Sequence, residues 1–289
     1  MSQNTLKFGA RTVEISHPEK EFFPDAELTK ADLVDYYRRI ADVMVPHLRN
    51  RPLVMHRYPD GLGDGGFVQQ ECPDYFPDWV DRVTVDKKTG GSVTHALCNN
   101  AATLVYLANQ ACTTPHVWLS RCDRPRYPDR IIFDLDPPED DFEPVRRAAL
   151  DLKESIESEG LAPFVMTTGS RGLHVLIPVR RDRDFDAIRD WAGTLAQKLA
   201  DRHPDRLTTE QRKEKRGNRL FLDILRNAYG QTAVAPYAVR MKPGAPVATP
   251  LDWDELGDRT LHPRRYTVGN IFRRLGQKSD PWEELIIDN

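Results

Sequence analysis

A short apolar strand that ends in two aspartates is the feature that most constrains this sequence. Residues 131–133 are β-forming Ile-Ile-Phe and Pro137 ends the run, which predicts a buried strand that stops at a turn. Side chains alternate between the two faces of a strand, so Asp134 and Asp136 are predicted to leave the same face.

Two carboxylates on one face repel each other and resist desolvation, and a cation between them relieves both costs. Hard divalent ions such as Mg²⁺ and Mn²⁺ take oxygen ligands and carry substrate phosphates on their remaining positions. The alternative is a solvated strand end that leads into a turn, because Asp before Pro commonly starts one.

Asp223 supplies a possible third carboxylate. It interrupts the apolar run 220–225, where a charge is costly to bury without a partner. Three carboxylates can hold two cations for phosphoryl or nucleotidyl transfer. A buried ion pair with Arg216 or Arg219 is the competing explanation.

The segment Gly169-Ser170-Arg171-Gly172-Leu173-His174 has the composition of an anion-binding loop. Two glycines allow the backbone to approach a ligand and direct N–H groups at it, and the Ser, Arg and His side chains add donors for a triphosphate. An ordinary tight turn is the alternative. The loop lacks the Gly-Lys-Ser/Thr ending of a P-loop, which argues against a Walker-type ATPase.

Two further residues have a structural explanation when each is taken alone. A single histidine on a strand, such as His116, is more often structural than catalytic, and Arg240 is typical of a surface ion pair. Cys112, His116 and Cys122 fit no standard zinc spacing.

Composition narrows the class of protein. The chain has 289 residues and a net charge of −3, so a binding site for a polyanion must be local. Its four cysteines form no CxxC pair and follow no secretory leader, which indicates reduced thiols in a cytoplasmic protein. No apolar run approaches the roughly 18 residues of a membrane span.

Several elements can be predicted from local pattern. Thr29 is a predicted N-cap, with Asp32 three residues on, for a helix that runs to Pro46. Strands are predicted over 7–15, 79–85 and 235–240.

The motifs, taken in order, closely resemble the polymerase domain of bacterial ATP-dependent DNA ligase D, of the archaeo-eukaryotic primase superfamily. The resemblance runs from about Ile15 to the C-terminal helix. It rests on the following segments: Asn109-Gln-Ala111, His116, Phe-Asp134-Leu-Asp136-Pro, Thr168-Gly-Ser170-Arg-Gly172-Leu-His174, Phe221-Leu-Asp223 and Ala235-Pro-Tyr-Ala-Val-Arg240.

The resemblance implies an α/β (α+β) primase-like fold, in which helices flank an RRM-like antiparallel catalytic sheet. It implies one domain over 1–289, with a smaller N-terminal α/β part for DNA ends at about 1–110 and a catalytic core at about 111–289. It also implies templated nucleotide addition at primer 3′ ends at breaks or short gaps, as in non-homologous end joining. The resemblance further implies that ribonucleotides are preferred and that each site holds two Mn²⁺ (or Mg²⁺) ions.

Carried over by position, Asp134, Asp136 and Asp223 resemble the family's metal ligands, and His116 its active-site histidine. The implied nucleotide-binding residues are Ser170, Arg171, Gly172, His174, Arg216, Arg240, His56 and Arg57. His56 departs from the family, since a lysine occurs there in relatives.

A second set resembles the family's contacts with DNA. Lys20 and Lys30 match two lysines that bind a 5′-phosphate, and His17 stands where relatives carry Asn. Phe67 matches one of two adjacent aromatics that stack on the template, but its neighbour is Val68. Local basic stretches fit a surface that follows DNA.

Three other functions remain open: a two-metal nuclease or phosphohydrolase, a non-catalytic module that binds DNA ends, and a primase that starts strands de novo. The implied partners are primer–template DNA with a 5′-phosphorylated gap or end, nucleoside triphosphates, Ku and a separate DNA ligase, with no membrane. The implied location is the bacterial nucleoid.

Overall fold

The predicted Asp-x-Asp strand lies inside a six-stranded sheet. The computed structural model describes residues 4–63, 65–137 and 141–287. The strand is β10, and the order of the sheet is β13-β14-β10-β12-β11-β16, antiparallel except for the β13–β14 pair. Its strands are β10 (Arg130–Asp136), β11 (Phe164–Thr167), β12 (Leu173–Pro178), β13 (Leu207–Thr208), β14 (Leu220–Asp223) and β16 (Thr249–Leu251).

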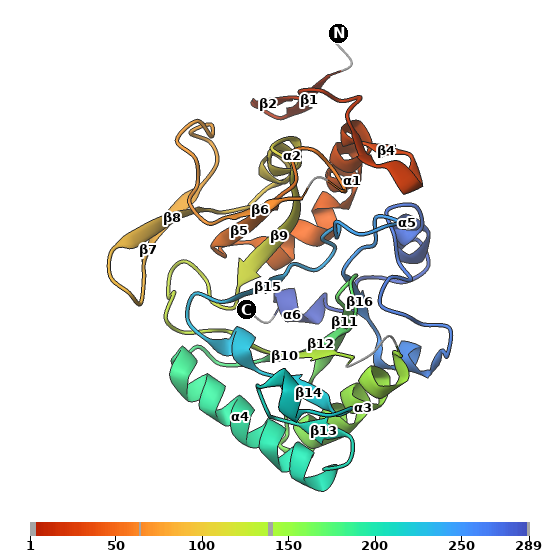
Figure 1. Cartoon of the computed structure of the whole chain (residues 1–289). Helices are drawn as coiled ribbons and strands as arrows, with labels where there is room; N and C mark the ends of the chain where they lie inside the picture. Colours follow the sequence, from red (N-terminus) through yellow and green to blue (C-terminus); the bar gives the residue numbers. More distant parts are fainter. Residues whose placement is uncertain (1–3, 64, 138–140, 288–289) are drawn as a thin grey trace.

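Two helices cover one face of this sheet. Helices α3 (Glu143–Ser158) and α4 (Phe185–Arg202) lie beneath it in Figure 1. Alternate residues of β10, namely Ile131, Phe133 and Leu135, pack with them in one apolar cluster. The strand period therefore turns Asp134 and Asp136 to the opposite face, towards the rest of the molecule.

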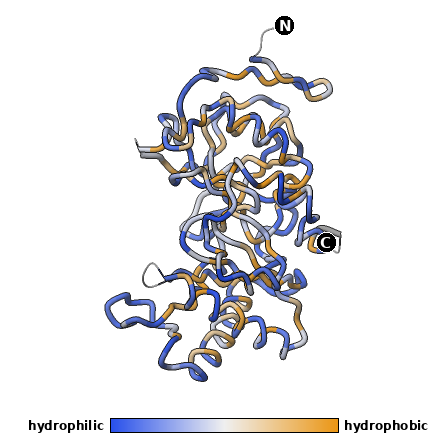
Figure 2. Tube along the Cα trace, turned by 90° about the vertical axis from the view of Figure 1, so that its right-hand side faces the viewer, coloured by the Kyte–Doolittle hydropathy of each residue, from blue (hydrophilic) through white to orange (hydrophobic). Residues whose placement is uncertain are grey.

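A second, four-stranded antiparallel sheet lies on that side, in the order β15-β9-β5-β6. Its elements and covering helices are β5 (Leu53–Arg57), β6 (Phe67–Gln69), β9 (Cys112–Trp118), β15 (Thr232–Val234), α1 (Lys30–Leu48) and α2 (Ala101–Asn109). Buried residues on this face of the six-stranded sheet, such as Ile132 and Leu176, share one core with those of the four-stranded sheet, and Figure 2 shows hydrophilic segments mainly on the outer loops.

The remaining elements are short. They are β1 (Thr5–Phe8), β2 (Arg11–Glu14), β3 (Glu21–Phe23), β4 (Leu28–Thr29), β7 (Arg82–Asp86), β8 (Ser92–Ala96), α5 (Ile271–Leu275), α6 (Glu284–Ile287) and 3-10 turns at Pro24–Ala26, Lys213–Lys215, Leu225–Asn227 and Trp253–Gly257. The β7–β8 hairpin projects from the body of the molecule (Figure 1).

The capping prediction for the first long helix is confirmed. Thr29 accepts a bond from the Asp32 backbone, and the Asp32 carboxylate accepts one from Thr29 in return. The predicted end at Pro46 is wrong, because α1 continues to Leu48 with Pro46 inside it. A proline this close to the C-terminus removes a single backbone hydrogen bond, which the last turn tolerates.

Three predicted strands need correction. Residues 7–15 form parts of two strands, because the chain turns at Gly9, whose φ is +61°. The strand predicted from residue 79 begins only at Arg82. Residues 235–240 form no strand, since Tyr237 has a φ of +65° and Val239 makes only an isolated bridge.

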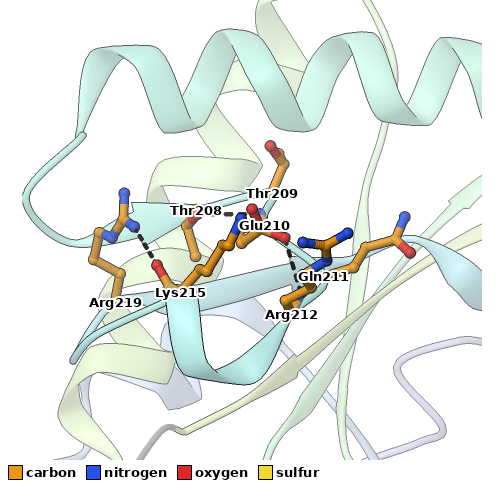
Figure 3. Close-up of a pocket in the computed structure, with 7 residues that line it drawn as sticks. All are labelled: Thr208, Thr209, Glu210, Gln211, Arg212, Lys215 and Arg219. Carbon is orange, nitrogen blue, oxygen red and sulfur yellow. Dashed lines mark hydrogen bonds between the residues drawn. The ribbon is translucent and has the colours of Figure 1, made fainter.

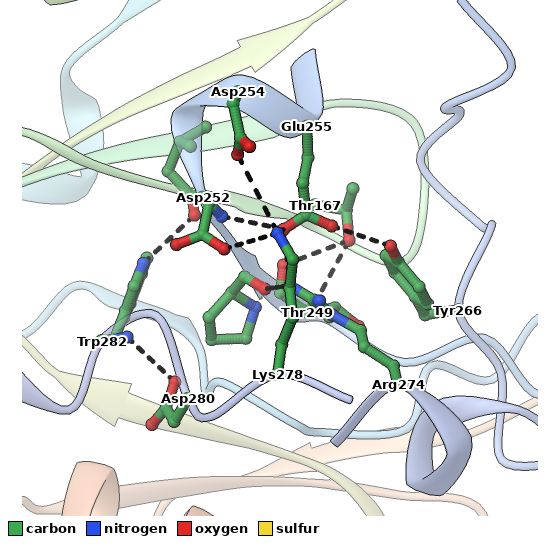
Figure 4. A network of polar contacts seen from close by, with 12 residues as sticks. Thr167, Thr249, Asp252, Asp254, Glu255, Tyr266, Arg274, Lys278, Asp280 and Trp282 are labelled. Atoms are coloured by element: carbon green, nitrogen blue, oxygen red, sulfur yellow. Dashed lines mark hydrogen bonds and ion pairs between the residues drawn. The ribbon is translucent and has the colours of Figure 1, made fainter. Parts of the chain in front are cut away.

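A polar network fixes the C-terminal segment to the six-stranded sheet (Figure 4). Arg274 donates to Glu255 and to the Pro250 carbonyl, while Lys278 pairs with Asp252. The buried Trp282 indole donates to the Val165 carbonyl of β11. Within the described ranges, no helix has the length and apolar character to cross a membrane.

Candidate active site

Sheet register brings together four polar side chains that are distant in sequence. Asp134 lies directly opposite Asp223 on β14 and opposite His174 on β12. Residues opposite each other in an antiparallel pair share a face, and Asp136 shares it through the strand period. Three carboxylates and a histidine thus face the second sheet.

Asp134 is the most constrained of the carboxylates, being 8% exposed. Its oxygens lie 3.2 Å from Arg226 Nε and 3.5 Å from His174 Nε2. Burial alone would raise the pKa of Asp134, but the charges of His174 and Arg226 outweigh it and hold the pKa at about 2. Asp134 is therefore ionised at neutral pH.

The other two carboxylates are less well compensated. Burial and the charge of Asp134 raise the pKa of Asp136. Burial also raises the pKa of Asp223, partly offset by the Leu225 backbone N–H, which donates to it at 2.7 Å. Among the described residues, Asp223 forms no ion pair within 4 Å with Arg216 or Arg219.

The donor set suits a hard divalent cation, which prefers carboxylate oxygens and would relieve the repulsion between these groups. As placed in the described residues, however, no three His, Cys, Asp or Glu side chains are close enough together to hold a metal ion. The Asp134 oxygens are instead directed to Arg226 and His174. The metal-binding role of the three aspartates stays a prediction.

Two histidines of the second sheet stack beside this group. The rings of His56 and His116 are parallel within 4°, with centroids 3.9 Å apart. Burial, together with nearby positive charge, lowers the pKa of His56 to about 4 and that of His116 well below its usual value. Nε2 of His116 and Nδ1 of His174 are buried without a hydrogen-bond partner, so both rings can still bond to a ligand.

The loop 168–172 is a tight turn between β11 and β12, and it also borders the site. Thr168 and Gly172 are bonded through their backbones at 3.0 Å, and Gly169 has a φ of +65°. A small cavity of about 70 Å³ is lined by His116, Asp134, Asp136, Thr168, Ser170, His174, Arg226, Val234 and Arg240. The loop 168–172 is thus a tight turn that can also bind a ligand in the small cavity.

A larger cavity of about 300 Å³ adjoins the first at Asp134 and Asp136. It is lined by Asp134, Asp136, Pro137, Arg171, Lys213, Arg216, Gly217, Arg219, Phe221 and Asp223. Arg171 donates to the Pro137 carbonyl, and the Arg216 guanidinium lies 4.0 Å from the Phe221 ring centroid. The walls of this cavity combine three carboxylates with several cations.

Arg240 borders the small cavity rather than forming a surface ion pair. It donates to the Thr168 carbonyl at 2.6 Å, and burial lowers its pKa. Arg226 is a site residue that the sequence did not single out, and Thr168 was part of a motif but was given no role. Arg226 carries no motif signal, and it reaches Asp134 only because the turn 225–227 folds back beside β10.

The basic loop between β13 and β14 borders a third hollow, of about 740 Å³, shown in Figure 3. It is lined by Thr208, Thr209, Glu210, Gln211, Arg212, Lys215 and Arg219. Arg219 donates to the Lys215 carbonyl, and Arg216 to the carbonyls of Glu210 and Gln211. These bonds fold the loop on itself and leave Arg216 in the cavity wall beside Asp223.

Three of the predicted DNA-end residues, His17, Lys20 and Lys30, lie together at the start of α1. Lys30 is 6% exposed, and its Nζ donates to the Ser16 carbonyl at 2.6 Å and to Ser16 Oγ at 2.9 Å. Lys20 Nζ lies 2.6 Å from Asp60. His17 has a φ of +49°, a conformation that Asn adopts more readily. Ser16 and Asp60 were not predicted.

Arg57 and Phe67 lie together, away from both cavities. They are cross-strand partners on β5 and β6, and the Arg57 guanidinium lies 5.5 Å from the Phe67 ring centroid. His56, the neighbour of Arg57, points to the opposite face, where it stacks on His116. The structure therefore does not bring Arg57 to the predicted nucleotide site.

A mainly antiparallel sheet that presents carboxylates beside a tight loop and several arginines is the arrangement expected of a primase-like nucleotidyltransferase. The chain belongs to the family of the LigD primase-polymerase domain, whose model matches residues 29–282. The predicted family and fold class are confirmed.

Similarity to individual proteins supports the same family. The chain is 31% identical over 271 residues to the multifunctional non-homologous end joining protein LigD of Mycolicibacterium smegmatis, covering 93% of this chain and 35% of that protein. It is also 31% identical over 275 residues to the bifunctional LigD of Bacillus subtilis, a match that covers 92% of this chain and 44% of that protein. The chain thus spans less than half the length of these relatives.

A solved structure has the same fold. The polymerase domain from Mycobacterium tuberculosis ligase D, in complex with DNA, superposes with a TM-score of 0.89 at 28% sequence identity. The match covers 96% of this chain and 98% of that one.

Proposed function

We propose that this chain is a template-dependent polymerase that adds nucleotides to primer 3′ ends at breaks or short gaps during DNA repair, such as non-homologous end joining. The observation that carries the proposal is the convergence of Asp134, Asp136 and Asp223 on one sheet face beside two joined cavities. The relatives named for end joining and the DNA complex of the similar structure support it.

Asp134, Asp136 and Asp223 would hold two Mn²⁺ or Mg²⁺ ions, which would activate the primer hydroxyl and offset charge on the leaving pyrophosphate. The cavity walls suit the rest of the substrate. Ser170 offers a hydroxyl, and Arg171, Arg216 and Arg240 offset the charge of the phosphates. The neutral His116 presents a buried ring nitrogen as a hydrogen-bonding group for the nucleotide.

We further propose that ribonucleotides are preferred and that Lys20 and Lys30 bind a downstream 5′-phosphate. The implied partners are Ku and a separate ligase, and the implied location is the bacterial nucleoid. An N-terminal end-binding part at about 1–110 and a catalytic core at about 111–289 complete the proposal. Both parts contribute to the four-stranded sheet, since β5 pairs with β9.

The test is primer extension on a short gapped duplex with a 5′-phosphate, supplied with Mn²⁺ or Mg²⁺ and either ribo- or deoxyribonucleotides. We expect templated addition that a chelator abolishes. A folded chain that binds this DNA but adds nothing would overturn the polymerase and favour an end-binding module. Cleavage of the DNA without triphosphates would favour a nuclease, and synthesis without a primer would favour a primase.

The two lysines at the start of α1 give a pH-dependent prediction. Burial and the charge of Lys20 lower the pKa of Lys30 from its usual 10.5 to about 8. Affinity for a 5′-phosphorylated gap is therefore expected to fall as the pH rises through 8 and Lys30 loses its proton. It also weakens below about pH 6, where the phosphate gains a proton.

The measurement is the ratio of affinities for gapped DNA with a 5′-phosphate and with a 5′-hydroxyl, from pH 6.5 to pH 9.5. The hydroxyl substrate is the control, because it lacks the group that Lys30 contacts. A ratio that stays constant up to pH 9.5 would contradict a role for Lys30 in binding the phosphate.

A further inference from the structure

The segment 235–240, which leads to Arg240 in the wall of the small cavity, has an unusual backbone conformation. The buried Tyr237 has a φ of +65°, in the left-handed region that a tyrosine rarely adopts. Such a conformation persists where the surrounding contacts enforce it, and residues of this kind gather at ligand sites. The contacts that hold Tyr237 therefore bear on the site that the chain reaches three residues later.

Helix α1 holds the backbone of this segment. The Tyr36 hydroxyl donates a hydrogen bond to the Tyr237 carbonyl at 2.7 Å. The Tyr37 hydroxyl accepts one from the Val239 backbone N–H at 3.0 Å and donates to the Thr113 carbonyl of β9 at 2.6 Å. Two adjacent tyrosines of α1 thus fix two successive peptide groups just before Arg240.

The C-terminal segment holds the Tyr237 side chain. The Tyr237 hydroxyl donates to Asp280 Oδ1 at 2.8 Å, and the other oxygen of this carboxylate lies 2.6 Å from His47 Nε2. Asp280 also accepts from the Trp282 backbone N–H at 3.0 Å (Figure 4). Burial would raise the pKa of Asp280, but these bonds lower it, so Tyr237 is bonded to a charged acceptor, which gives a strong hydrogen bond.

Arg240 takes its position from the backbone held in this way. Its own N–H donates to the Pro246 carbonyl at 2.7 Å, and its guanidinium donates to the Thr168 carbonyl at 2.6 Å. Within the described residues Arg240 forms no ion pair with a carboxylate. Its charge is therefore available to an anionic ligand in the cavity.

We propose that Tyr237 and Asp280 are positioning residues for the nucleotide site, which hold the backbone before Arg240 so that its guanidinium meets the triphosphate. Neither residue is among those that line the two joined cavities, so both act through Arg240. The inference rests on the proposed function, because it assumes that the phosphates of a nucleotide lie against Arg240.

The test measures binding of ATP without catalysis. The chain is mixed with Mn²⁺ and a gapped duplex whose primer ends in a dideoxynucleotide and whose next template base is thymine. Tyr237→Phe keeps the ring and loses only the hydroxyl, and it is expected to raise the Kd of ATP by about tenfold. Asp280→Asn, which removes the charge of the acceptor, is expected to have an effect in the same direction. The affinity for the gapped duplex alone is expected to be unchanged.

A second background separates positioning from a general loss of structure. Arg240→Gln removes the charge itself, so adding Tyr237→Phe to it should cause no further loss of ATP affinity. Tyr229→Phe is the matched control, because it removes a hydroxyl that donates to the Asp86 carbonyl at 2.7 Å, away from both cavities. It should leave the affinity for ATP unchanged.

Two results would overturn the inference. One is a Kd of ATP for Tyr237→Phe equal to that of the wild type, and the other is an equal loss from Tyr237→Phe in the wild-type and Arg240→Gln backgrounds. A wild type that binds ATP with this dependence on Tyr237 but extends no ordinary primer would refute the polymerase and leave the positioning role standing.

Discussion

Asp136→Asn is expected to lower templated nucleotide addition by about a thousandfold, because a metal ligand contributes several kcal/mol of transition-state stabilisation. The substitution is not expected to lower the stability of the fold. Burial and the Asp134 charge raise the pKa of Asp136, so its ionised form is less stable in the folded chain than in the unfolded one. At pH 7 the melting temperature is expected to stay the same or rise.

The measurements are single-turnover extension of a gapped duplex and thermal unfolding of the same preparation. Asp42→Asn, which removes an exposed carboxylate from α1, is the matched control and should leave both unchanged. Extension at the wild-type rate by Asp136→Asn would exclude this carboxylate from the chemistry.

Gly172→Ala is expected to damage both the activity and the stability of the protein. A Cβ atom at Gly172 would lie 1.8 Å from the Leu135 carbonyl oxygen and 2.8 Å from Asp136 Oδ1. Strands β10 and β12 would have to separate at the point where they hold the carboxylates. Overpacking of this kind costs about 3 kcal/mol, which corresponds to a fall in melting temperature of roughly 5 to 10 °C.

Gly257→Ala is the matched control, because nothing lies within 4 Å of a Cβ at that position and its φ is not positive. Thermal unfolding and primer extension compare the two variants. A Gly172→Ala protein with the stability and activity of the wild type would show that β10 and β12 can separate freely, against the close approach seen in the structure.

Predictions from local pattern were confirmed in part. The strand 131–136, its inward-facing apolar residues and the capping of α1 follow from side-chain period and short-range hydrogen bonds. The strand predicted over 235–240 failed because β-forming residues there are interrupted by the positive φ of Tyr237, which is set by the packing of distant segments.

The nucleotide site was only partly predictable. The motif 169–174 indicated the loop that carries Ser170, which lines the small cavity. Arg57 was assigned to the same site by resemblance, yet it lies beside Phe67 and Tyr75, while its neighbour His56 faces His116. His56 and Arg57 are consecutive in a strand, so their side chains must point to opposite faces. Which of the two faces meets the catalytic cavity depends on how the two sheets pack.

The sequence by itself determined the family, the class of fold and the residues from which a carboxylate site can be built, because motifs and periodicity are written along the chain. Only the tertiary structure decided which groups meet. It set Asp223 and His174 opposite Asp134, brought Arg226 to that carboxylate and placed Tyr75 on Arg57. Strand register and sheet packing join residues far apart in sequence, and these contacts arise from the burial of the whole core rather than from any local pattern.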